Sequence, residues 1–142
     1  MLSDLKMLQL IHQGSDMGVV GIRCVLPRAQ EDTLRQALQS QLAEYESIEQ
    51  RSAGLLRSRG ERSKGVNPMA RVSSELFSTM KMAADPSPSK IAEMMIQGNT
   101  MGMVKSMRSL RDYQGEDPEV KQLAEKLLQT ELHNIEEMKR YL

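Results

Sequence analysis

The sequence predicts an all-α protein: an antiparallel bundle of four long helices, with a short extra helix in a long crossover. Apolar residues recur at helical spacing, and no segment alternates with period two over the length of a strand. The five prolines all stand between the periodic stretches. A chain of 142 residues can bury a core, so we expect one domain over residues 1–142.

The first predicted hairpin covers about residues 2–59. Its first helix, residues 2–25, contains no proline, and Pro27 marks the turn into a second helix over about residues 28–59. The apolar stripe of that second helix has a 3–4 spacing that is interrupted at Ser52. The stripe comprises Leu34, Leu38, Gln41, Tyr45, Ile48 and Leu55.

The crossover covers about residues 60–86 and contains the predicted short helix, about residues 69–84. Asn67 is the expected N-cap of this helix, and Pro68 takes its first helical position. The connection is much longer than the turns within the hairpins, as expected between two hairpins of one bundle.

The second predicted hairpin covers about residues 87–142. Its first helix spans about residues 87–113, and its second begins at Asp117-Pro118-Glu119, which supplies a cap, a proline and an early acid. The stripe of the last helix comprises Val120, Leu123, Leu127, Glu131, Asn134, Met138 and Tyr141.

The two hairpins resemble each other in sequence. Residues 11–20 align on residues 95–104 at an offset of 84, with the shared pattern Q-G-x-x-M-G, and residues 44–49 align on 131–136 at an offset of 87. The second alignment matches Glu44 with Glu131. We therefore expect two hairpins related by a pseudo-two-fold axis.

Four glycines of the shared pattern fall inside predicted helices, where glycine costs roughly 1 kcal/mol relative to alanine. They are Gly14, Gly18, Gly98 and Gly102. A spacing of four places each pair on one helix face, so we expect the first helices of the two hairpins to pack closely there. The alternatives are helix kinks and room for a bound molecule.

The hairpin repeat, the crossover and an acid on each second helix together resemble the ferritin-like superfamily. A looser similarity is to the spore-coat-type ferritin-like proteins of spore-forming bacteria. Di-iron members hold their metals with one Glu from each first helix and a Glu-x-x-His from each second helix. The corresponding positions here read Glu44-x-x-Ser47 and Glu131-x-x-Asn134 on the second helices, and Gln13 and Gln97 on the first. The resemblance therefore implies a ferritin-like bundle whose di-metal site has decayed.

Two interpretations of these polar residues stay open. A non-standard site for iron, manganese or zinc would draw on Glu44, Glu131, Gln13, Gln97, His12 and His133. An internal hydrogen-bond network would instead use the amides to satisfy the buried glutamates. We favour the network and expect no cofactor, because two carboxylates without matching imidazoles make a poor iron site.

The charge is zero in sum but unevenly distributed. Residues 51–71 hold six basic residues and one acidic residue, whereas residues 116–142 hold seven acidic and four basic residues. The basic stretch is either a solvated loop or a docking site for an acidic surface, with Arg57, Arg59, Arg62 and Lys64 as candidates. A neutral total without interleaved aromatic residues argues against nucleic acid.

Twelve methionines accompany few aromatic residues and no tryptophan. Seven of these methionines lie between residues 80 and 107: Met80, Met82, Met94, Met95, Met101, Met103 and Met107. Core packing is the expected role, and a partner groove or a copper(I) site are the alternatives.

We expect a non-enzymatic structural or interaction protein that forms oligomers or binds a protein partner. The alternatives are a metal-binding or redox protein with a carboxylate site, and an adaptor that docks through its Met-rich helix or basic crossover. The single cysteine, Cys24, and the absence of a transmembrane run or signal-peptide pattern predict a cytoplasmic protein. The resemblance implies association with spores as another location.

Overall fold

The computed structural model describes residues 2–63 and 87–142. These residues form four α-helices: α1 (Asp4–Val25), α2 (Asp32–Ser58), α4 (Pro88–Asp112) and α5 (Pro118–Lys139). They contain no strand, only an isolated bridge between Leu2 and Tyr113. The all-α prediction is confirmed. The predicted short helix, with Asn67 and Pro68 at its start, lies outside the described residues.

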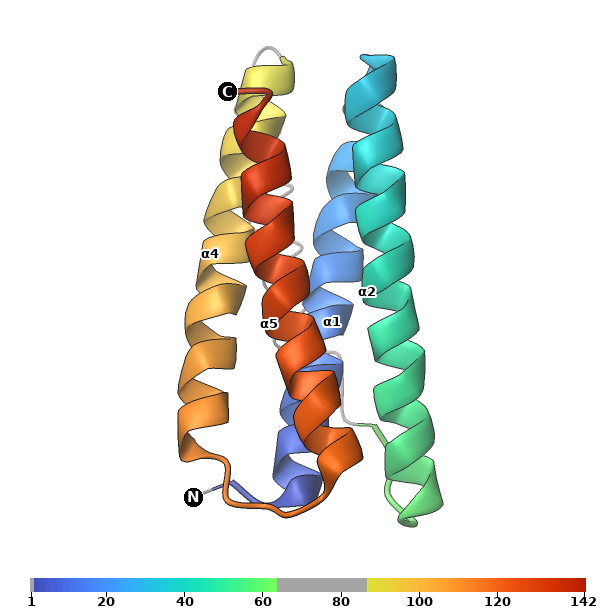
Figure 1. The fold of residues 1–142 in the computed structure, drawn as a ribbon. Helices are drawn as coiled ribbons and strands as arrows, with labels where there is room; N and C mark the ends of the chain where they lie inside the picture. The colour runs from blue at the N-terminus through green and yellow to red at the C-terminus, as the bar shows by residue number, and fades with distance from the viewer. Residues whose placement is uncertain (1, 64–86) are drawn as a thin grey trace.

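The four helices form two antiparallel hairpins that pack side by side (Figure 1). Helices α1 and α5 run in one direction along the bundle, and α2 and α4 run in the other. The hairpins contact each other through α1, which touches α4 and α5, and through α2, which touches α5. Among the described helices, none is long and apolar enough to cross a membrane.

Side-chain caps begin the helices largely where the sequence predicts. The hydroxyl of Ser87 accepts a hydrogen bond from the backbone N–H of Lys90, and the carboxylate of Asp117 accepts one from Glu119. The exception is α2, which begins at Asp32 instead of near residue 28. A short 3₁₀ helix, η1 (Leu26–Arg28), contains Pro27, so the chain turns before α2 begins.

The buried stripe of α5 agrees with the prediction: six of its members are buried and Tyr141 is half-buried. On α2 the predicted interruption at Ser52 is wrong, because Ser52 is fully buried and the stripe continues to Leu56. The Ser52 hydroxyl donates to the Glu49 carbonyl oxygen at 2.9 Å, which lets a polar side chain occupy a core position.

The buried positions also correct the register of the repeat. On the first helices the offset of 84 holds at four buried pairs: Met7/Ile91, Leu8/Ala92, Ile11/Met95 and Ser15/Asn99. On the second helices the buried positions coincide at an offset of 86, from Leu34/Val120 to Ser52/Met138. Tyr45 is therefore the structural counterpart of Glu131, and the predicted partner Glu44 is exposed.

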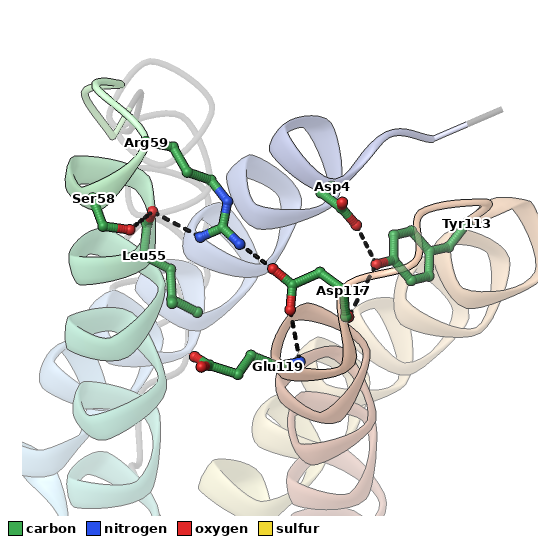
Figure 2. Close-up of polar contacts among 7 residues, drawn as sticks. All are labelled: Asp4, Leu55, Ser58, Arg59, Tyr113, Asp117 and Glu119. Carbon is green, nitrogen blue, oxygen red and sulfur yellow. Dashed lines mark hydrogen bonds and ion pairs between the residues drawn. The ribbon is translucent and has the colours of Figure 1, made fainter.

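A polar cluster ties three helices and the α4–α5 turn together at one end of the bundle (Figure 2). Arg59, which follows α2, forms an ion pair with Asp117 and donates to the Leu55 carbonyl oxygen at 3.1 Å. The Tyr113 hydroxyl donates to Asp4 and to the Asp117 carbonyl oxygen. The bundle end thus depends on contacts between residues far apart in the sequence.

We expect Arg59→Ala to lower the free energy of unfolding by about 1 kcal/mol, because the Arg59–Asp117 pair is only 28% and 25% exposed. Urea denaturation followed by circular dichroism would measure it. Arg57→Ala is the matched control, since Arg57 is exposed near the same helix end. Equal losses in the two variants would contradict a specific role for the ion pair.

Candidate functional site

A groove with a volume of about 370 Å³ opens between α1 and α4. Five methionines line it: Met7, Met17, Met94, Met95 and Met101. Glycines of both helices also border it, and side chains from α2 and α5 form its floor. Mobile thioether side chains around a glycine-lined opening make an adaptable apolar wall.

Helices α1 and α4 are in contact, but the atoms nearest to a Cβ added at Gly14, Gly18 or Gly102 belong to side chains of α2 and α5. The described contacts therefore do not show the close backbone approach predicted at these glycines. A Cβ on Gly18 would lie 2.6 Å from the Tyr45 ring, and one on Gly102 would lie 2.6 Å from Glu131 Oε1. Each of these two glycines makes room for a side chain from the second helix of its own hairpin. Gly14 faces Leu127 Cδ2, and beside Gly98 there is open space.

Glu131 lies in the floor of the groove with 2% of its surface exposed. Ser106 on α4 donates a hydrogen bond to Glu131 Oε2 at 3.0 Å. Burial raises the pKa of Glu131 to about 8, and the hydrogen bond from Ser106 opposes this rise only in part. The carboxyl is therefore mostly protonated at neutral pH.

Tyr45 and Asn99 form a second polar pair in the same floor. The Tyr45 hydroxyl donates to Asn99 Oδ1 at 2.8 Å. Burial, followed by the charge of Glu131, raises the pKa of Tyr45 well above its ordinary value. Asn99 is 5% exposed, and its Nδ2 has no hydrogen-bond partner among the described residues. A buried N–H donor therefore remains at the groove.

The structure does not gather the six predicted metal ligands. Glu131 and Gln13 line the groove, but Gln97 and His133 are exposed. Glu44 is also exposed and pairs with Lys126 Nζ at 3.2 Å, because the one-residue change of register turns it away from the core.

His12 is buried on the side of α1 that faces α2. Its Nδ1 lies 3.3 Å from the Ser52 hydroxyl and 3.4 Å from the Glu49 carbonyl oxygen. Across residues 2–63 and 87–142, no group of three or more His, Cys, Asp and Glu side chains could hold a metal ion.

The predicted docking residues differ in their surroundings. Arg57 and Arg62 are exposed, whereas Arg59 belongs to the cluster at the bundle end. The Arg62 carbonyl oxygen accepts a hydrogen bond from Gln9 at 2.9 Å. Lys64 lies outside the described residues.

Asn99 and Ser106 were not predicted as site residues from the sequence, and Tyr45 was predicted only as a core residue. A usable signal exists for Asn99, because the offset of 84 aligns it with Ser15 and both are buried polar residues. A carboxyl pair between α1 and α2 was missed as well. Burial first, and then the hydrogen bond and charge of Asp16, raise the pKa of Glu49 to about 7.

Comparisons of this chain with protein-family models, with curated proteins and with solved structures find no match. The groove is therefore interpreted from its own geometry and chemistry.

We expect alanine to have opposite effects at two glycines of the shared pattern. Gly18→Ala places a Cβ against the Tyr45 ring and should lower stability by roughly 1–3 kcal/mol. Gly98→Ala meets open space and should raise it by about 0.5–1 kcal/mol, because alanine favours the helix. Urea denaturation would measure both, and effects of the same sign would contradict the described packing.

Replacement of Glu131 should change how stability depends on pH. The pKa of Glu131 is about 8 in the folded state and 4.5 ordinarily, so the folded protein holds a proton that the unfolded chain releases between these values. The free energy of unfolding therefore falls as the pH rises through this window. At about pH 9, Glu131→Gln should be more stable than the unmodified protein by on the order of 3 kcal/mol.

Near pH 4.5 the advantage of Glu131→Gln should be nearly absent, because Glu131 is then protonated in the folded state and only half ionised in the unfolded state. The titration of Glu49 contributes equally to the stability of both proteins, so its effect cancels when the two are compared. Chemical denaturation at the two pH values measures the difference. An advantage that is independent of pH would contradict a buried, titrating Glu131.

Proposed function

We propose that this is a non-enzymatic binding protein whose groove between α1 and α4 holds a small, mostly apolar molecule. The observation that carries the proposal is the groove of about 370 Å³, with its methionine walls and buried polar floor. Ligand pockets commonly measure roughly 300–1,000 Å³ and combine apolar walls with a few polar groups.

The polar groups of the floor favour binding over catalysis. Ser106 donates to Glu131, an arrangement that resembles a nucleophile beside a base. Burial keeps Glu131 protonated near neutral pH, however, so it does not accept the serine proton there. The hydroxyl of Tyr45 is held by Asn99, and its raised pKa keeps it neutral.

We infer further that the bundle is a ferritin-like fold in which a binding groove replaces the metal centre of the di-iron members. The directions of the four helices support this inference (Figure 1). The repeat offsets of 84 and 86 residues support it as well. At the matched position of the second helices, one half carries Tyr45 and the other Glu131, so the paired carboxylates of a di-metal centre are replaced by a phenol and an acid.

Filling the groove should weaken binding of an apolar molecule. Gly98→Leu should extend a side chain into the open space beside α4 and weaken binding of the fluorescent apolar probe N-phenyl-1-naphthylamine at least roughly tenfold. A fluorescence titration of the full-length protein would measure this, and circular dichroism would verify the fold.

Gly54→Leu is the matched control, because Gly54 is also a helix glycine but does not border the groove. It should bind the probe as the unmodified protein does. Failure of the unmodified protein to bind, or undiminished binding by Gly98→Leu, would overturn the proposed function.

A further inference from the structure

We propose, building on the binding function above, that the groove selects uncharged apolar molecules that carry a carbonyl oxygen. In this proposal the oxygen accepts hydrogen bonds from Asn99 Nδ2 and from the Glu131 carboxyl group.

Asn99 supplies the first donor. Its Oδ1 already accepts the hydrogen bond of the Tyr45 hydroxyl, which fixes the orientation of the amide. Asn99 lines the groove, and its Nδ2 is buried without a partner within the part of the chain that the structure describes. A buried donor left unsatisfied costs about 1–3 kcal/mol, and a ligand oxygen would recover part of that cost.

Glu131 supplies the second donor. Because Gly102 has no side chain, the carboxyl group can lie directly against α4 at this position, and both residues line the groove. The hydroxyls of Ser106 on α4 and Tyr45 on α2 are its polar neighbours, and Lys105 stands exposed at the groove. Burial keeps the acid protonated near neutral pH, which makes its O–H a donor.

Tyr45 links the two donors. Its hydroxyl bonds to Asn99, and its titration responds to the charge of Glu131, so both groups belong to one polar floor. A carbonyl oxygen has two lone pairs and can accept from two donors at once. The surrounding methionines and glycines suit an apolar chain on either side of that oxygen.

Charged analogues fit this floor less well. A carboxylate would give up its hydration beside the Glu131 acid, and Lys105, the basic residue of the groove lining, is exposed and could pair with it only at the cost of its own hydration. An ammonium group would first require Glu131 to lose its proton, and it would present further N–H donors to Asn99 Nδ2. A neutral carbonyl avoids both costs.

The test compares three probes of equal chain length: 2-octanone, octanoate and octylamine. Isothermal titration of the full-length protein near pH 7 should show that 2-octanone binds at least roughly tenfold tighter than either charged probe. Asn99→Leu should remove this preference. Gln97→Leu is its control, because Gln97 lies on the same helix but is exposed.

The pH dependence of binding, together with the variant Glu131→Gln, tests the proposal if Asn99→Leu fails to fold. At about pH 9 the unmodified protein should bind 2-octanone several-fold more weakly than near pH 7, because Glu131 has lost its donor proton. Glu131→Gln retains an N–H donor at every pH and should bind 2-octanone equally at both.

Failure of the carbonyl preference and failure of the binding function give different experimental results. Tighter binding of octanoate or octylamine, or pH-independent binding of 2-octanone by the unmodified protein, would overturn the carbonyl preference while the binding function stands. If none of the three probes binds and Gly98→Leu does not alter uptake of the naphthylamine probe, the binding function and this inference both fail.

Discussion

The arrangement of the bundle depends on two helix positions that lack a side chain, Gly18 on α1 and Gly102 on α4. Tyr45 lies against the first and Glu131 against the second, and a Cβ would come within 2.6 Å of either. Because these bulky groups pass over the backbone of the neighbouring helix, each hairpin packs tightly within itself. Helices α1 and α4 are themselves in contact, and the groove that opens between them is lined by methionines.

The two hairpins share this packing but differ in chemistry. Tyr45 and Glu131 occupy matched positions, yet both form hydrogen bonds to α4, through Asn99 and Ser106 respectively. The polar floor therefore lies toward α4. At the bundle end, the contacts of Arg59, Tyr113 and Asp117 join α2, α5 and the start of α1 (Figure 2). Polar contacts hold the end together, and the opening lies between α1 and α4.

Much of the fold could be predicted from local signals. Asp117 and Pro118 mark the start of α5, and the spacing of apolar residues identifies its buried stripe. The register of the repeat could not be read from matching letters. Glu44 aligns with Glu131 by identity, but one residue turns a helix by about 100°, and that turn moves Glu44 from the core to the surface. The partners of Asn99 and Ser106 come from other helices, which sequence spacing does not encode.

The distribution of unfavourable features supports a role for the groove. Gly98 weakens α4 while facing open space, Asn99 Nδ2 is buried without a partner among the described residues, and Glu131 is a buried acid without a cation. Each of these reduces stability, and all three border the same groove. Buried polar atoms without a partner among the described residues also lie away from the groove, at Gln41 Oε1, Glu49 Oε2 and Asn134 Nδ2. The groove differs in combining such an atom with a buried acid and a helix glycine that faces open space, and conflicts that meet at one site are typical of a position kept for function at the expense of stability.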